Sequence, residues 1–565
     1  MSPAIAQSPL RYSYVHGASD VPLVGETIGV HFERSVDRWG DREAIVMRHQ
    51  NIRLTFRQLK DRVDSLAAGL LALGLEPGDR IGIWATNCIE WVITQFATAR
   101  AGLIQVNLDP AYRTAEIDYA LNKVGCKALI TMDRFKSSDY LGMLRTLMPE
   151  IDTSTPGALR SAKVPSLSLL IHIGQAQEPG FLRFDDVAAM ASDAARERLA
   201  QLQHQLQFDD PINIQFTSGT TGTPKATTLS HHSLLNNALS LGSILGVREG
   251  DRLCRTGPLF HIMGTTASLY AVGLGATLVF ASETFNPRAV LEAVSQERCT
   301  HLSGVPTMFV MMLNLPDFHT FDLSSVRGGI MGGSLCPIEL MERVMTDMHA
   351  RDLIITYGMT ETGPTSMCTR ASDPIERRVS TVGQVFPHVE VKIVDADGKV
   401  VPVGSVGELC TRGYSVMRGY WNDPEVTRKA IDANGWMHTG DLAVMDEEGY
   451  ARIVGRIKEM VIRGGENLFP AEIEGFLTKH PDIAEAQVFG VPDEKFGEEL
   501  CAWILPKEGR VVTEESVRAF SEGRIAHYKV PRYLRFVDRF PVNATGKAQK
   551  KLMREQMLVE LAKDA

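Results

Sequence analysis

Short apolar runs alternate with amphipathic stretches through most of the first 400 residues. In 59–73, leucine and valine recur at helical spacing, Gly74 follows, and a Pro-Gly-Asp turn leads into the apolar run 80–84. A second helical stretch at 90–101 leads to another apolar run at 103–107. Helix-period segments between buried strands are typical of βαβ units. The pattern therefore predicts an α/β fold in which helices cover parallel sheets.

The longest stretch without a formal charge, 256–282, is long enough to raise the question of a membrane span. It contains His261, four glycines and several hydroxyl residues. We therefore expect a buried helix followed by a strand at Thr277–Phe280, and no transmembrane segment. Residues 150–180 carry prolines among Ser and Thr, and we expect them to form an irregular surface connection.

The character of the sequence changes after Gly440. Residues 450–456 predict a strand that ends in a turn, and the residues beyond it are typical of a compact α+β segment of about a hundred residues, within the usual domain size. We place the border at 455–459. The prediction is an N-terminal domain at 1–455 and a C-terminal domain at 456–565.

Composition and charge narrow the function. Hydrophobic residues make up 44% and charged residues 22% of the 565, as in ordinary multidomain globular proteins. The net charge of −9 argues against a nucleic-acid partner. Eight scattered cysteines without a paired spacing predict a reduced chain without a structural zinc site, and residues 1–17 lack a targeting pattern. These features together predict a cytoplasmic protein.

A loop rich in Ser, Thr and Gly follows the apolar strand 212–216: residues 217–225 read Thr-Ser-Gly-Thr-Thr-Gly-Thr-Pro-Lys. Small residues let backbone N–H groups approach phosphate oxygens, hydroxyls add donors, and Lys225 adds charge. The loop is not a Walker A motif, because Pro224 precedes the lysine. From the residues alone, a phosphate-binding loop and a plain turn both remain open.

Six further segments share their order and spacing with one known superfamily. They are Pro-Leu-Phe-His-Ile-Met-Gly at 258–264, Gly-Val-Pro-Thr at 304–307, Tyr-Gly-Met-Thr-Glu-Thr-Gly at 357–363, Trp-Met-His-Thr-Gly-Asp at 436–441, Gly-Arg-Ile-Lys-Glu at 455–459 and Asn-Ala-Thr-Gly-Lys at 543–547. With the loop at 217–225, they make the chain resemble the adenylate-forming (AMP-binding) superfamily from about residue 30 to 555. The run 463–467 is most similar to fatty-acyl-CoA synthetases, close to the acyl-CoA synthetase family member 2 branch.

The resemblance implies a large N-terminal domain of α/β subdomains with parallel sheets and a small, mobile α+β lid domain at the C-terminus. It also implies a two-step ligase reaction with ATP, Mg²⁺ and coenzyme A. A fatty acid of medium or longer chain is the expected substrate, because the pocket segments show no charge for a second polar group. An aryl or short branched acid, a separate carrier protein as acceptor, a luciferase-like oxygenase and a non-catalytic nucleotide-binding scaffold are alternatives, and a homodimer is possible.

The same resemblance implies catalytic and metal-binding roles. Lys547 would be the lysine that neutralises charge during adenylation. Glu361 and the hydroxyl of Thr220 would hold Mg²⁺, an ion that prefers oxygen ligands. His261 would border the carboxylate and acyl pocket, although a lone histidine among apolar residues is more often a core residue.

Other matching positions imply contacts with ATP and coenzyme A. Tyr357 would stack on adenine, and Asp441 would accept hydrogen bonds from the ribose hydroxyls. Arg456 would face the ribose or phosphate, and Lys458 would stand at the hinge. The remaining nucleotide contacts would be Thr217, Ser218, Gly219, Thr221, Gly222, Lys225, Gly333, Ser334, Gly358, Met359 and Thr360, and Gly464 and Gly465 would let the pantetheine arm pass.

Positive charge gathers between Arg524 and Arg554, where basic residues exceed acidic ones by eight. A solvated basic face is the plain interpretation of such a cluster. Because Lys547 lies inside it, we interpret the cluster as a positive lid that meets ATP and coenzyme A.

Overall fold

The computed structural model describes residues 9–217, 224–332, 336–463, 466–493, 495–542 and 547–564. The chain divides into two compact units. The large unit comprises 16–390 and 411–437, and the small unit comprises 1–15, 391–410 and 438–565. Each unit is described by itself below.

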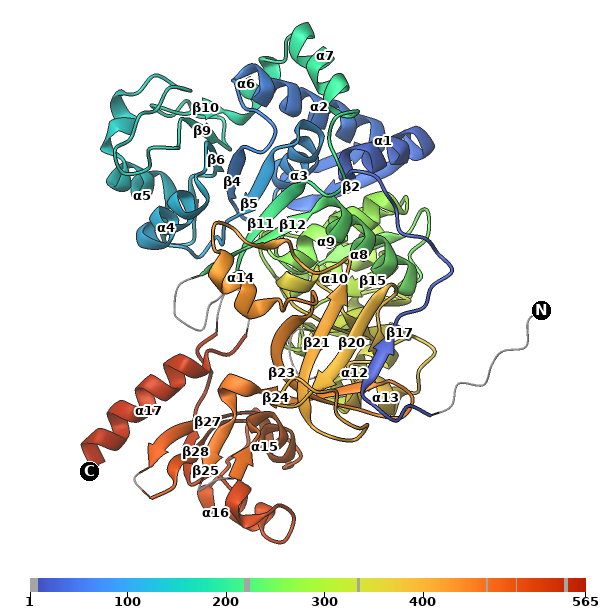
Figure 1. Cartoon of the computed structure of the whole chain (residues 1–565), viewed down its shortest axis with the longest axis vertical. Helices are drawn as coiled ribbons and strands as arrows, with labels where there is room; N and C mark the ends of the chain where they lie inside the picture. Colours follow the sequence, from blue (N-terminus) through green and yellow to red (C-terminus); the bar gives the residue numbers. More distant parts are fainter. Residues whose placement is uncertain are drawn as a thin grey trace, which may run out of the picture. The chain divides into compact units, whose positions relative to one another are not determined.

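A mostly parallel sheet of eight strands in the described residues contains the predicted βαβ unit (Figure 1). Strands β4 and β5 pair in parallel, and α3 (Ile89–Ala101) connects them, as the sequence pattern predicted. The spatial order is β10 (Leu182–Arg183), β9 (Leu169–His172), β6 (Ala128–Thr131), β4 (Arg80–Trp84), β5 (Ile104–Asn107), β11 (Pro211–Thr217), β12 (Lys225–Ser230) and β22 (Gly419–Tyr420).

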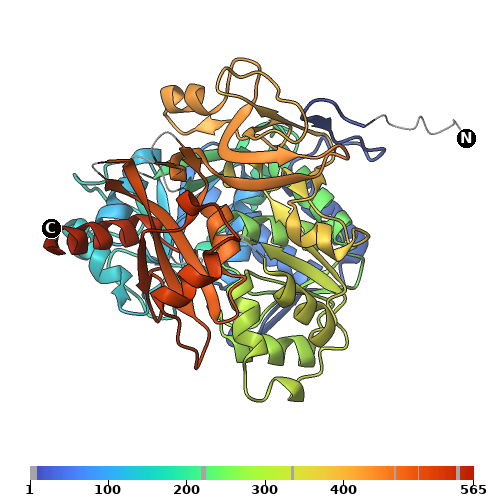
Figure 2. The ribbon, with the colours of Figure 1, turned by 90° about the horizontal axis from the view of Figure 1, so that it is seen from below.

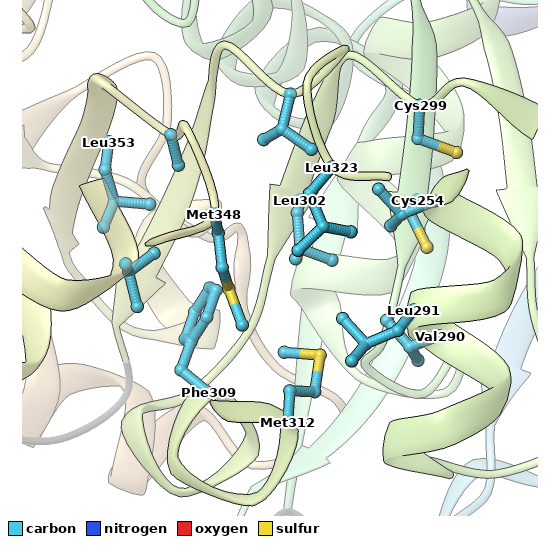
Figure 3. Packing of buried hydrophobic residues seen from close by; sticks show 14 of the residues in the cluster. Cys254, Val290, Leu291, Cys299, Leu302, Phe309, Met312, Leu323, Met348 and Leu353 are labelled. Carbon is cyan, nitrogen blue, oxygen red and sulfur yellow. The ribbon is translucent and has the colours of Figure 1, made fainter. Parts of the chain in front are cut away.

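A second sheet of the large unit has nine strands among the described residues, and most of them are parallel. Its order is β19 (Gln384–Val385), β18 (Met367–Cys368), β17 (Asp352–Tyr357), β16 (Gly328–Gly332), β15 (His301–Ser303), β13 (Arg252–Arg255), β14 (Thr277–Phe280), β2 (Glu43–Met47) and β3 (Ile52–Thr55). Figure 3 shows Leu291, Leu302 and Met312 gathered in the core that fills one face of this sheet. Buried parallel strands of this kind confirm the predicted α/β class.

Helices cover both sheets. Thr55 caps α2 (Phe56–Ala72) with a reciprocal capping box, and Gly74 lies just beyond its end with a φ of +85°. Figure 1 shows α2, α6 and α7 gathered together. The other helices of the large unit are α1 (Ile28–Trp39), α4 (Thr114–Val124), α5 (Tyr140–Leu147), α6 (Phe184–Ala189), α7 (Asp193–Leu202), α8 (His231–Ile244), α9 (Ile262–Gly273), α10 (Pro287–Glu297), α11 (Pro306–Leu313), α12 (Ile338–Asp347), α13 (Ile375–Ser380) and α14 (Pro424–Ala430).

The uncharged run 256–282 folds as predicted, into the buried helix α9 followed by β14. Among the described residues, no helix is both long and apolar enough to cross a membrane. The interpretation of 150–180 as an irregular connection is wrong in part. Residues 169–172 form β9, a fully buried strand that pairs in parallel with β6, because the Leu-Leu-Ile run fits an inner strand position.

The small unit contains the predicted α+β segment (Figure 2). Its sheet has the order β26 (Glu466–Leu468), β25 (Val461–Arg463), β28 (Gly497–Pro506) and β27 (Ile483–Asp493), and β29 (Tyr533–Phe536) also pairs with β28. The helices are α15 (Pro470–Leu477), α16 (Glu514–Ser521) and α17 (Lys550–Asp564). A further five-stranded sheet runs β1 (Tyr14–His16), β20 (Val389–Val394), β21 (Gly407–Gly413), β23 (Met437–Met445) and β24 (Ala451–Arg456).

The basic cluster at 524–554 is less positive than its sequence suggests. Arg532 pairs with Asp493 at 2.9 Å, and Lys550 pairs with Glu474 at 2.6 Å. Other basic members pair with Glu472, Glu560, Glu555 and Glu498. All of these acids stand outside the window 524–554, so the excess counted along the sequence is largely balanced within the small unit. The interpretation of the whole cluster as a positive lid is therefore not supported by these pairings.

Candidate active site

Residues 218–223 join two antiparallel strands of the large unit, β11 and β12. The flanking residues, Thr217 at the end of β11 and Lys225 at the start of β12, are direct partners in the ladder. The Lys225 ammonium lies 4.9 Å from the centroid of the Tyr420 ring. The predicted contacts Ser218, Gly219, Thr220, Thr221 and Gly222 lie outside the described residues. The strands therefore fix both ends of the predicted phosphate loop.

Glu361 is a buried carboxylate in contact with Thr217. It lies in a short 3-10 turn at 360–362, just after β17, and is 4% exposed. Its Oε1 accepts a hydrogen bond of 3.0 Å from Thr217 Oγ1 and another of 3.0 Å from the hydroxyl of Tyr420. Burial, with the negative charge of Glu361, raises the pKa of Tyr420, so this phenol stays a donor. The carboxylate is thus positioned from two other strands.

Tyr357 and the predicted contacts beside it stand where parallel strands end. Tyr357 is the last residue of β17 and is half-buried, and Gly358 follows it. A Cβ on Gly358 would lie 1.9 Å from the carbonyl oxygen of Pro364, so only glycine fits. The N–H of Met359 donates to Thr362 Oγ1 at 3.0 Å. The carboxyl ends of parallel strands are the usual ligand sites of open α/β sheets.

His261 caps α9 and is half-buried. Its Nδ1 accepts a hydrogen bond from the N–H of Met263 at 3.4 Å, and the preceding carbonyl, of Phe260, accepts one from Asn107 Nδ2 at 2.9 Å. Asn107 belongs to a buried amide network with Asn213 and with Thr265 of α9. The sequence reasoning missed this network, although Gln and Asn alternate along both strands that carry it. The backbone that presents His261 is therefore tied to the centre of the sheet.

Asp441 and Arg456 form one part of the predicted site in the small unit. They are direct partners in the antiparallel pair of β23 and β24, so they lie close together in space although they are separated along the chain. Arg456 Nε lies 2.8 Å from Asp441 Oδ1, and Asp441 is 6% exposed. A fixed carboxylate of this kind suits the two hydroxyls of a ribose.

Lys547 lies in the same charged neighbourhood. Desolvation and the positive charges of Arg456 and Lys458 lower its pKa, whereas Glu459 and Asp441 act in the opposite direction. By its accessible surface, Lys547 as a whole is exposed to solvent. Lys458 is exposed in the 3-10 turn 457–459 that follows β24. Gly333, Ser334, Gly464 and Gly465 lie outside the described residues.

The fold and these residues define the class of protein. Residues 32–421 match the model of the AMP-binding enzyme family, and residues 472–547 match that of the AMP-binding enzyme C-terminal domain. The chain belongs to the AMP-binding enzymes. The predicted border at 455–459 falls between the two matched ranges and remains a prediction.

Individual relatives are similar over nearly their whole length. The chain is 47% identical to the medium-chain acyl-CoA ligase ACSF2, mitochondrial, of Danio rerio over 551 residues, which cover 97% of this chain and 91% of the relative. It is 44% identical to the putative acyl-CoA synthetase YngI of Bacillus subtilis, and the match covers 95% of this chain and 98% of that protein. The crystal structure of ATP-bound MatB from Rhodopseudomonas palustris matches with a TM-score of 0.81 at 30% sequence identity. This match covers 94% of the present chain and 98% of the MatB chain.

Proposed function

We propose that this chain joins a medium-chain fatty acid to coenzyme A, with ATP converted to AMP and pyrophosphate. It is an AMP-forming acyl-CoA ligase, and two relatives of nearly equal length are named as a medium-chain acyl-CoA ligase and a putative acyl-CoA synthetase. The observation that carries the proposal is the placement of Glu361, a buried carboxylate held by Thr217 directly beside the predicted phosphate loop.

In the first half-reaction, a carboxylate oxygen of the fatty acid attacks the α-phosphorus of ATP, and pyrophosphate leaves. Two unit charges about 4 Å apart repel by about 4 kcal/mol at an effective dielectric near 20. Lys547 would neutralise this repulsion, and Asp441 would hold the ribose. In the second half-reaction, the thiol sulfur of coenzyme A attacks the acyl carbon, the thiol proton leaves, and AMP is released.

The donor set around Glu361 suits Mg²⁺. A carboxylate with neighbouring hydroxyl oxygens is the kind of site that this ion takes, usually with several waters and substrate phosphates. Glu361 and Thr220 would hold it. The ion would offset the negative charge of the phosphate oxygens.

The acid substrate is tested by measuring pyrophosphate release across acids of two to sixteen carbons and aryl acids, with and without coenzyme A. We expect the highest kcat/KM for medium-chain acids, and acyl-CoA as product when coenzyme A is present. A preference for aryl acids would contradict the proposed substrate. Release of pyrophosphate without thioester formation would instead point to a carrier protein as the acceptor.

Lys458→Pro should separate the two half-reactions. Lys458 lies in the short turn after β24, and proline there fixes φ and would stop the proposed rotation of the C-terminal domain. We expect acyl-AMP formation to persist while transfer to coenzyme A falls at least about tenfold, because only the transfer step depends on the proposed rotation. Single-turnover assays of each half-reaction measure this. Lys458→Ala is the control, and an equal loss of both steps in the proline variant would contradict the hinge.

The pH dependence of adenylation should report Lys547. Its lowered pKa means that the ammonium loses its proton at a lower pH than an ordinary lysine, so activity should fall on the alkaline side below the usual lysine range. Lys547→Arg keeps its charge and should move this fall to higher pH. Rates of pyrophosphate release measure the profile, and thermal melting in the same buffers checks the fold. Coincident profiles would contradict the assignment.

Location and assembly are further parts of the proposal. The Danio rerio relative is mitochondrial by its name, whereas the composition here favours the cytoplasm. Fractionation of the source cells decides between the two compartments. Light scattering of the purified chain tests the homodimer.

A further inference from the structure

Two strands of the five-stranded sheet bring three potential metal ligands together in the small unit. Glu408 and Cys410 stand two residues apart on β21, so their side chains share one face of the strand. His438 stands on the neighbouring strand, β23. One ligand atom from each of the three residues lies within 4.8 Å of the other two. None of the three has a role in the proposed reaction.

The distances are close to those of ligands around one ion. Cys410 Sγ lies 3.5 Å from His438 Nδ1, and that nitrogen lies 2.8 Å from Glu408 Oε2. In a tetrahedral zinc site, a nitrogen at ~2.0 Å and a thiolate at ~2.3 Å from the ion lie about 3.5 Å apart. The separation of Cys410 Sγ and His438 Nδ1 is thus that of two ligands of one ion. Glu408 Oε2 is at hydrogen-bond distance from the same nitrogen, and it would need to move about half an ångström away from it to become the third ligand.

We propose that Glu408, Cys410 and His438 form a binding site for Zn²⁺. The sulfur, nitrogen and oxygen donors are the set that Zn²⁺ takes, and a thiolate ligand excludes Mg²⁺ and Ca²⁺. Binding sends the thiol proton to solvent and leaves the imidazole proton on Nε2. The His438 side chain is 32% exposed and that of Glu408 18%, whereas Cys410 is buried, so an ion and a water in the fourth position would enter from the side of His438 and Glu408.

The site is built rather than incidental, because a second contact fixes the carboxylate. Glu408 Oε1 accepts a hydrogen bond of 3.0 Å from the N–H of Gly440, and this leaves Oε2 directed at His438. Thr439 stands between His438 and Gly440 in the sequence, and its hydroxyl donates a hydrogen bond of 2.6 Å to the carbonyl oxygen of Leu409. The two strands are thereby held in register at the ligands. The sequence did not predict this site, because its ligands come from two strands and no Cys-x-x-Cys spacing marks them.

Co²⁺ titration of the full chain without nucleotide, in a thiol-free reductant, tests the site. We expect a near-ultraviolet thiolate-to-cobalt band and the visible bands of tetrahedral Co²⁺, both removed by one equivalent of Zn²⁺. Cys410→Ala should abolish the thiolate band and weaken Zn²⁺ binding at least about tenfold. Cys501→Ala is the matched control, because Cys501 is also a buried strand cysteine of the small unit. No band in the unchanged chain, or a band that persists in Cys410→Ala, overturns the proposal.

Glu408→Gln provides a second variant if Cys410→Ala does not fold. The amide oxygen can still accept from Gly440, so the turn keeps its contact. The thiolate band should remain, at a Co²⁺ affinity at least about tenfold lower. An unchanged affinity would show that the carboxylate is no ligand and would overturn the three-residue site.

Discussion

Lys547→Ala should abolish formation of the acyl-adenylate while leaving thioester formation from supplied acyl-adenylate largely intact. The substitution removes the cation proposed to offset two approaching anions, and loss of one such electrostatic contact costs about 10²–10³-fold in kcat. The second half-reaction begins from a neutral acyl carbon and does not need this charge. Pyrophosphate release measures the first step, and thioester formation from synthetic acyl-AMP measures the second.

Lys551→Ala is the control for this experiment. Lys551 lies four residues further along, 81% exposed on α17, and its ion pair with Glu555 is a surface contact. Such pairs contribute little, so both half-reactions should continue at the normal rate. An equal fall of both half-reactions in Lys547→Ala would show that the lysine supports the fold or binding in general, and it would contradict the proposed role.

The sequence predicted the elements that depend on periodicity. The helix and strands around 80–107 were found because buried parallel strands and one-sided helices leave distinct spacings of apolar residues. The strand β9 was missed, since three apolar residues and a histidine after a proline-containing stretch are too short a signal. The motif residues Thr217 and Glu361 were found by resemblance, and the structure brings them into hydrogen-bond contact.

Contacts between distant segments could not be predicted in this way. Tyr420 stands 59 residues from Glu361 along the chain, and no local pattern distinguishes it from an ordinary core aromatic residue. The acids that pair with Arg532 and Lys550 are likewise brought together only by folding. Charge counted along the sequence therefore overstated the positive character of the C-terminal segment.

Glu361→Gln should reduce adenylation at least about a hundredfold and raise the Mg²⁺ concentration needed for half-maximal rate. The amide has nearly the shape of the carboxylate, and its oxygen can still accept from Thr217 and Tyr420. What it lacks is the negative charge that a hard cation requires. A loss of one charged contact to the ion is comparable to the removal of an electrostatic group in other active sites, about 10²–10³-fold in kcat.

Tyr420→Phe separates the charge of Glu361 from its positioning. This change removes one donor to Oε1 but keeps the carboxylate and the contact with Thr217. We expect a fall of about tenfold, smaller than in Glu361→Gln and the effect of one hydrogen bond of ~1.5 kcal/mol to a charged group, with an unchanged Mg²⁺ requirement. Pyrophosphate release across Mg²⁺ concentrations at saturating ATP measures both variants. If Glu361→Gln lost activity with the same Mg²⁺ dependence as the unchanged chain, Glu361 would act by holding the loop and not by binding the ion.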